Sequence, residues 1–161
     1  MDFLSSIPDQ DIASSTGSSF SRKRRPLILV VEDDQDNLLL LYHLVTSLGC
    51  NVLLAQEGRA GLAIIQETWP DLVLLDIVMP HMNGFEVLQH LRQLPEAQSV
   101  SIVAVTGLAS SEEKHQLLQS GCCDYLCKPY LIDDLQSLIC RHLGFQTMPQ
   151  LIEPFNVAIR A

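Results

Sequence analysis

Acidic, hydroxyl and amino side chains follow short apolar segments of this 161-residue sequence. The residues found at the carboxyl ends of these segments are Glu32, Asp33, Asp76, Thr106 and Lys128. Carboxylates crowded together repel one another and need a cation. Oxygen ligands without His or thiolate favour Mg²⁺, which usually pairs with a phosphate. A nearby hydroxyl and ammonium group would bind phosphoryl oxygens, so these residue types indicate metal-assisted phosphate chemistry.

The spacing of apolar residues predicts the elements that position these side chains. Continuous apolar runs predict buried strands, and each is followed by a segment with helical periodicity. The expected strands are 27–31, 52–55, 72–75, 102–105 and 125–127. The expected helices are 36–48, 58–68, 84–93, 111–120 and 131–143. This alternation predicts an α/β fold, a doubly wound five-stranded parallel sheet with helices on both faces.

A flavodoxin-like strand order of 2-1-3-4-5 would place the first and third strands side by side. Ligands of such sheets bind where the strand order reverses, at the carboxyl ends of the strands. We therefore expect Glu32, Asp33 and Asp76 in one pocket, with Thr106 and Lys128 on its rim. A carboxylate held beside Mg²⁺ can itself accept a phosphoryl group and form an aspartyl phosphate.

Several other polar residues fit helix caps better than catalysis. Asp34 and Asp36 stand near the start of the first expected helix, and Asp36 occupies the position expected for the N-cap. Ser110 or Ser111, with Glu113 in the first turn, is expected to cap the fourth helix.

The cysteines and histidines lack the spacing of a metal site. An odd total of five cysteines argues against a disulfide framework. Cys122, Cys123 and Cys127 form no Cys-x-x-Cys pair, and we interpret them as small buried residues around a strand. The histidines fall at helical or loop positions and are interpreted as surface residues: His43, His81, His90, His115 and His142.

Charge and length restrict the possible partners. The net charge of −9 disfavours binding to nucleic acid or to an anionic membrane, and no apolar run reaches the roughly 18 residues of a membrane span. We expect a cytoplasmic protein with a flexible N-terminal tail (1–25), one folded domain (26–144) and a short C-terminal tail (145–161). If the sequence is complete, it has no room for a DNA-binding output domain.

The strand-end residues resemble those of a known family. The matching segments, in order, are Val31-Glu32-Asp33-Asp34, Leu75-Asp76-Ile77-Val78-Met79-Pro80 with Asn83-Gly84, Val105-Thr106-Gly107, and Asp124-Tyr125-Leu126-Cys127-Lys128-Pro129. From about residue 26 to 144 the chain resembles the receiver domain of two-component response regulators, of the stand-alone type that acts in chemotaxis. This resemblance implies that Asp76 accepts phosphate from a histidine kinase or a histidine phosphotransfer protein.

The same resemblance implies the roles of the surrounding residues. Mg²⁺ would be held by Asp76, by Asp33 directly, by Glu32 through water, and by the backbone carbonyl of Val78. The protein would catalyse its own phosphorylation and dephosphorylation and would not otherwise be an enzyme.

Phosphoryl binding and switching would involve the fourth and fifth strands. Thr106 and Lys128 would bind the phosphoryl group, and the bond between Lys128 and Pro129 is expected to be cis. Thr106 would then move inward and Tyr125 would rotate toward the interior. This movement would reshape the face of the fourth helix, fifth strand and fifth helix, where a downstream protein or a second copy would dock.

The residues two positions beyond Asp76 and Thr106 are Val78 and Leu108, and neither side chain can orient an attacking water. We therefore expect a long-lived phosphorylated state. The acidic turn after the first strand excludes the Gly-x-Gly-x-x-Gly of dinucleotide-binding domains. An aspartate-nucleophile phosphatase would carry a second Asp at position 78. Two alternatives stay open: a phosphate-independent interaction module and an intermediate of a phosphorelay.

Overall fold

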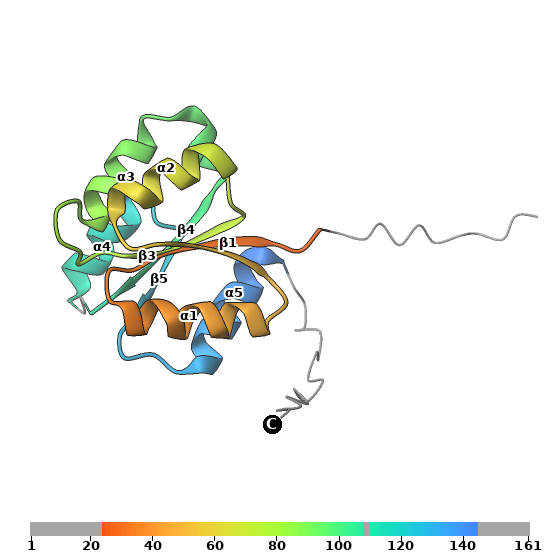
Figure 1. Cartoon of the computed structure of the whole chain (residues 1–161). Coiled ribbons are helices and arrows are strands. Elements are labelled where there is room, and N and C mark those ends of the chain that lie inside the picture. The colour runs from red at the N-terminus through yellow and green to blue at the C-terminus, as the bar shows by residue number, and fades with distance from the viewer. Residues whose placement is uncertain (1–23, 108–109, 145–161) are drawn as a thin grey trace, which may run out of the picture.

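The computed structural model describes residues 24–107 and 110–144, which form a parallel sheet with helices on both faces (Figure 1). The strands are β1 (Leu27–Val31), β2 (Asn51–Ala55), β3 (Leu72–Asp76), β4 (Ser101–Thr106) and β5 (Asp124–Cys127). The helices are α1 (Gln35–Ser47), α2 (Gly58–Thr68), α3 (Gly84–Arg92), the 3₁₀ helix η1 (Pro95–Ser99), α4 (Ser111–Gln119) and α5 (Ile132–Leu143). The predicted fold class is confirmed.

The strands pair in parallel in the order β2-β1-β3-β4-β5, which confirms the predicted flavodoxin-like order. Side chains of β1 alternate between two apolar layers. Leu29 and Val31 pack in the layer covered by α2, α3 and α4, whereas Ile28 and Val30 pack in the layer covered by α1 and α5. Because both faces of the sheet are covered, its inner strands are apolar at consecutive positions.

The start of α1 differs from the prediction. Asp34 is the N-cap: its backbone is extended and its Oδ1 accepts a hydrogen bond of 2.9 Å from the backbone N of Asn37. The expectation that Asp36 is the N-cap was therefore wrong. Asp36 lies inside the first turn, where its negative charge still favours the positive end of the helix.

The cap of α4 follows the prediction. The Ser110 hydroxyl accepts a hydrogen bond from the backbone N of Glu113, and the Glu113 carboxylate accepts one from the backbone N of Ser110. These hydrogen bonds form a capping box. The Ser110 hydroxyl also donates a hydrogen bond to the Glu113 carboxylate, and this bond, together with the one from the Ser110 backbone N, lowers the pKa of Glu113. The 3₁₀ helix over Pro95–Ser99 was not predicted, because the sequence signal there was read only as the end of α3.

The interpretation of Cys123 as a buried residue and that of His142 as a surface residue were wrong. Cys122 is buried, and burial raises the pKa of its thiol to about 12, but its neighbour Cys123 is exposed. Cys127 is half-buried. Four of the histidines are exposed, whereas His142 is half-buried beside Asp124, because α5 packs its last turn against the start of β5.

Residues 1–23 and 145–161, where the sequence predicts most of two tails, lie outside the described residues, as does Leu108. Of the helices that the structure describes, none combines the length and the apolar composition needed to cross a membrane.

Candidate functional site

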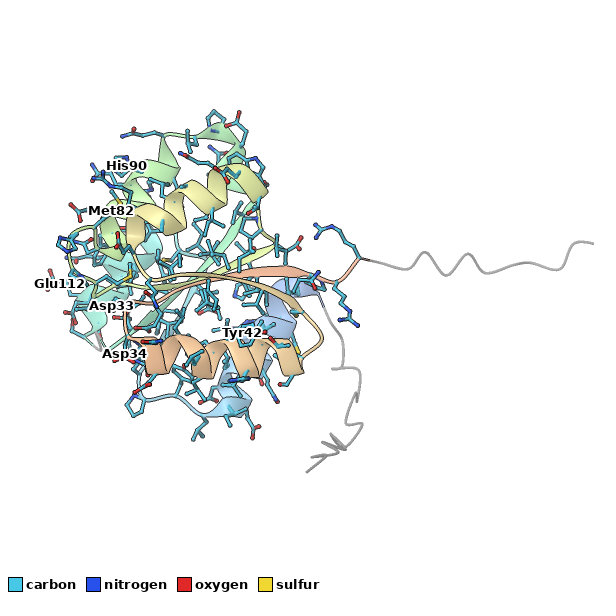
Figure 2. The ribbon with its side chains drawn as sticks, in the orientation of Figure 1. Asp33, Asp34, Tyr42, Met82, His90 and Glu112 are labelled. Carbon is cyan, nitrogen blue, oxygen red and sulfur yellow. The ribbon has the colours of Figure 1, made fainter. Side chains whose placement is uncertain are left out.

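The carboxyl ends of β1, β3, β4 and β5 bring the predicted site residues to one edge of the sheet. Val31 at the end of β1 is paired with Leu75 of β3, so Glu32 and Asp33 emerge beside Asp76. Figure 2 shows Asp33 and Asp34 at this edge, beside the start of α1. The convergence follows from parallel pairing, because all strands of such a sheet end at the same edge.

Three carboxylates meet at this edge. One oxygen from each of Glu32, Asp33 and Asp76 lies within 4.8 Å of the other two. Glu32 is 1% exposed and Asp76 is 5% exposed, whereas Asp33 is open to solvent. Two buried carboxylates are thus joined by a third that faces the solvent, which leaves one side of the cluster open to a ligand.

The ammonium group of Lys128 is shared between the two buried carboxylates. Its Nζ lies 2.7 Å from Glu32 Oε2 and 3.2 Å from Asp76 Oδ2. Burial acts to lower the pKa of Lys128, but the hydrogen bond to Glu32 and the charge of Asp76 outweigh it and the pKa is raised. Burial raises the pKa of Glu32 despite the hydrogen bond from Lys128. One cation therefore faces three acidic groups, and the cluster keeps excess negative charge.

Backbone groups fix the orientation of the two buried carboxylates. The backbone N of Val78 donates a hydrogen bond of 3.1 Å to Asp76 Oδ1, and the backbone N of Asp34 donates one of 3.2 Å to Glu32 Oε1. Gly84 supports the loop after β3: a Cβ at this position would lie 2.7 Å from the backbone oxygen of Asp76. Only a residue without a side chain permits this close approach.

The remaining predicted residues lie on or directly after strands β3, β4 and β5. Thr106 ends β4 and is fully buried, and the Lys128–Pro129 bond is cis, as predicted. Tyr125 on β5 is half-buried, and the Nζ of Lys114 lies 5.3 Å from the centre of its ring. The side chain of Val78 is 61% exposed.

The donor set fits Mg²⁺. The clustered atoms are carboxylate oxygens, which are hard ligands, and one of the acids is solvent-exposed, so a hydrated ion can approach. Within residues 24–107 and 110–144, these three acids are the one group of potential ligands close enough to hold a metal ion.

Comparison with known proteins agrees with this geometry. The family described as the response regulator receiver domain matches residues 28–140. The chain belongs to this family. As a receiver domain it is a signalling module of two-component systems, and receiver domains bind Mg²⁺ in their acidic site.

Relatives of known sequence differ in how much of their length the receiver domain represents. Response regulator PleD of Caulobacter vibrioides is 38% identical over 67% of this chain and 23% of its own length. Sensor protein GacS of Pseudomonas syringae is 36% identical over 84% of this chain and 15% of its own length. The chain thus spans less than a quarter of these two relatives. It spans 95% of the polar-differentiation response regulator DivK of Brucella ovis, at 30% identity.

Solved structures share the fold. The receiver domain of sensor histidine kinase PA1611 from Pseudomonas aeruginosa is 29% identical with a TM-score of 0.69, covering 74% of this chain and 98% of its own. That structure has a magnesium ion coordinated in the active site cleft. Chemotaxis protein CheY4 of Vibrio cholerae is 27% identical with a TM-score of 0.69, covering 73% of this chain and 98% of its own.

One feature of the site was not anticipated. Sequence reasoning assigned Lys128 to the phosphoryl group and Glu32 to the metal, but in the structure these side chains bind each other. The pair spans 96 positions in sequence, so no local pattern could indicate it. The burial of Glu32 at the end of an apolar strand is the signal that could have found it, since a buried carboxylate requires a partner.

Proposed function

We propose that this chain is a single-domain response regulator of the cytoplasm in which Asp76 accepts a phosphoryl group from a phosphohistidine. The folded receiver domain comprises residues 26–144. The observation that supports this proposal most strongly is the cluster of three carboxylates beside Lys128, at the edge of the sheet where receiver domains bind Mg²⁺. A carboxylate in such a cluster is both the nucleophile and part of the metal site.

In the proposed transfer, an oxygen of Asp76 forms a bond to phosphorus as the bond from phosphorus to the histidine nitrogen breaks. The leaving imidazole keeps the electron pair of that bond. Mg²⁺, held by Glu32, Asp33, Asp76 and the carbonyl of Val78, would neutralise charge on the transferred group. The hydrogen bond from the backbone N of Val78 to Oδ1 keeps the acceptor carboxylate oriented.

Lys128 has a second role in this proposal. Its ammonium group contacts both Glu32 and Asp76. It can therefore stay near Asp76 and replace a contact with a carboxylate by a contact with a phosphoryl oxygen. The hydroxyl of Thr106, at the end of the neighbouring strand β4, would donate a hydrogen bond to the same group.

The output of the proposed switch is the face of α4, β5 and α5. Tyr125 is half-buried there with the Lys114 ammonium against its ring, so an inward rotation would separate the two groups. A downstream protein, or a second copy of the chain, would bind the changed face. A phosphorelay would use the same acceptor and would pass the phosphoryl group to a second histidine.

The lifetime of the phosphorylated state is set in part by Val78. Its exposed side chain is apolar and cannot orient a water molecule for attack on phosphorus. Replacing Val78 with Asn is expected to speed the loss of phosphate several-fold, as measured by following the phosphorylated fraction over time. An unchanged or slower rate would contradict this role.

Acetyl phosphate provides a direct test of acceptance, because it supplies a phosphoryl group without a kinase. Intact mass spectrometry should detect one added phosphoryl group on the wild type and on Asp36→Asn when Mg²⁺ is present. Asp36 is a suitable control because it is an exposed aspartate that is not one of the three clustered acids. Asp76→Asn should gain none. Absence of the adduct from all three proteins, with Mg²⁺ present, would favour the phosphate-independent module.

A further inference from the structure

The ammonium group of Lys114 on α4 contacts an aromatic ring rather than an acid. Its Nζ lies over Tyr125, 5.3 Å from the centre of the ring. Within residues 24–107 and 110–144, Lys114 makes no ion pair. The face of an aromatic ring is negative, so it attracts a cation held above it. This contact therefore joins α4 to the neighbouring strand β5.

The acid that precedes Lys114 in sequence is engaged elsewhere. Oε2 of Glu113 accepts hydrogen bonds of 3.0 Å and 2.6 Å from the backbone N and the hydroxyl of Ser110. These bonds lower the pKa of Glu113 and direct its carboxylate toward the start of α4. The capping box therefore holds Glu113, and Lys114 remains in contact with the ring.

Tyr125 lies beside the residues that end β4. It is paired with Ala104, and both residues pack in the apolar layer covered by α2, α3 and α4. Thr106 lies two residues beyond Ala104 on β4, so its side chain points to the same face of the sheet. In the proposed switch, Thr106 moves toward the phosphoryl group and Tyr125 rotates inward on this face. The rotation takes the ring away from Lys114.

The contact between Lys114 and Tyr125 favours one position of the ring. The ammonium group stabilises the ring in the half-buried position that the structure shows. Inward rotation, which accompanies phosphoryl binding in the proposed switch, breaks this contact. Because such coupling is reciprocal, removing the contact should strengthen the binding of a phosphoryl group.

We propose that Lys114 is a positioning residue: it holds Tyr125 in the outer position and thereby lowers the affinity of the Asp76 site for a phosphoryl group. This proposal rests on the proposed function, which supplies the acceptor and the rotation of the ring. Attraction between charges predicts the opposite effect, because a lysine near the site would strengthen the binding of an anion. The sign of the change when a neutral residue replaces Lys114 therefore distinguishes the two roles.

The test is the affinity of the whole chain for beryllofluoride, an anionic mimic of a carboxylate-bound phosphoryl group, measured by calorimetric titration at saturating Mg²⁺. Lys114→Gln should bind it about two- to fivefold more tightly than the wild type. Lys114→Arg keeps a cation over the ring and should match the wild type. Arg59→Gln is the matched control, because Arg59 is exposed in the first turn of α2 and its loss changes the charge equally. It should bind no more tightly than the wild type.

A second pair of variants tests whether Lys114 acts through the ring. Tyr125→Leu removes the ring, so adding Lys114→Gln to this variant should leave the affinity unchanged. The proposal would be overturned by an unchanged or weaker affinity in Lys114→Gln, or by a gain that persists without the ring. Either result would leave the proposed function intact. A wild type that does not bind beryllofluoride would overturn both proposals, so the two failures are distinguishable.

Discussion

Acidic residues at the two ends of the sheet differ in how fully they are paired with hydrogen-bond donors and cations. At the amino end, Asp71 accepts two hydrogen bonds of 2.8 Å from Arg24 and one of 2.7 Å from the backbone N of Leu27. Asp124 accepts hydrogen bonds from Arg141 and from the backbone N of Tyr125, and His142 lies 3.2 Å from it. At the carboxyl end, three carboxylates cluster, and the one lysine beside them binds Glu32 and Asp76.

This difference separates acids that stabilise the fold from acids that react. The hydrogen bond from Arg24 lowers the pKa of Asp71, whereas burial raises the pKa of Glu32. A carboxylate with a full set of partners has little tendency to bind anything else. A cluster with excess negative charge is costly in the folded state and is relieved by a divalent cation, so incomplete pairing is what makes the carboxyl end reactive.

The largest expected effect is on metal binding. Asp33→Asn removes the solvent-exposed acid of the cluster and should lower Mg²⁺ affinity by at least roughly tenfold, as measured by calorimetric titration. Asp71→Asn removes an acid at the other end of the sheet and should leave the affinity unchanged. Equal affinities for the wild type and Asp33→Asn would show that an acid at the carboxyl end contributes no more to Mg²⁺ binding than one at the amino end.

Lys128→Ala should be the next most disruptive change. It leaves Glu32 and Asp76 buried without their cation and should lower the free energy of unfolding by about 2 kcal/mol without Mg²⁺. Saturating Mg²⁺ should recover part of this loss, because the metal supplies positive charge to the same carboxylates. Urea unfolding with and without Mg²⁺ measures both values, and a loss that Mg²⁺ does not reduce would contradict the account.

Asp71→Asn should have a smaller and pH-dependent effect on stability. Removing the charged acceptor of the Leu27 backbone N is expected to cost about 1 kcal/mol at neutral pH. Because the folded-state pKa of Asp71 is lowered, its stabilisation is present above the unfolded-state pKa of about 3.9 and is lost as the pH falls through the folded-state value. Denaturation curves of wild type and variant should therefore converge at acidic pH, and a constant difference would be evidence against this role.

The smallest effect on stability concerns two acids at the start of α1. They belong neither to the paired acids of the amino end nor to the three clustered acids. Asp34→Ala removes the N-cap hydrogen bond to Asn37 and should cost about 1 kcal/mol. Asp36→Ala removes only a charge in the first helical turn and should cost about 0.3 kcal/mol. Thermal unfolding compares the stability of the two variants. A larger loss of stability for Asp36→Ala would indicate that Asp36 is the N-cap, as the sequence predicted.

The sequence predicted the sheet well because its central strands are buried on both faces. Continuous apolar runs such as 27–31 and 72–75 have few other interpretations, and their order along the chain implies parallel pairing. The site could be predicted to the same extent, since residues at strand ends are brought together by topology. The positions of Glu32, Asp33 and Asp76 needed no knowledge of side-chain packing.

Features that depend on side-chain partners could not be predicted. The N-cap of α1 was misplaced by two residues because Asp34 and Asp36 have the same capping chemistry, and only backbone geometry distinguishes them. The contact between Lys128 and Glu32, and the burial of His142 beside Asp124, each join an element to a distant one. Such contacts depend on side-chain conformations and on how distant elements pack, which a single sequence does not specify.

The position of the phosphoryl group is the most direct test of the account. Borohydride reduces an aspartyl phosphate to homoserine, and peptide mass spectrometry then locates the reduced residue. After treatment of the whole chain with acetyl phosphate and Mg²⁺, we predict homoserine at position 76 and an unmodified aspartate at positions 33, 71 and 124. Homoserine at position 33, or at an acid of the amino end, would contradict the proposed division between reactive and structural acids.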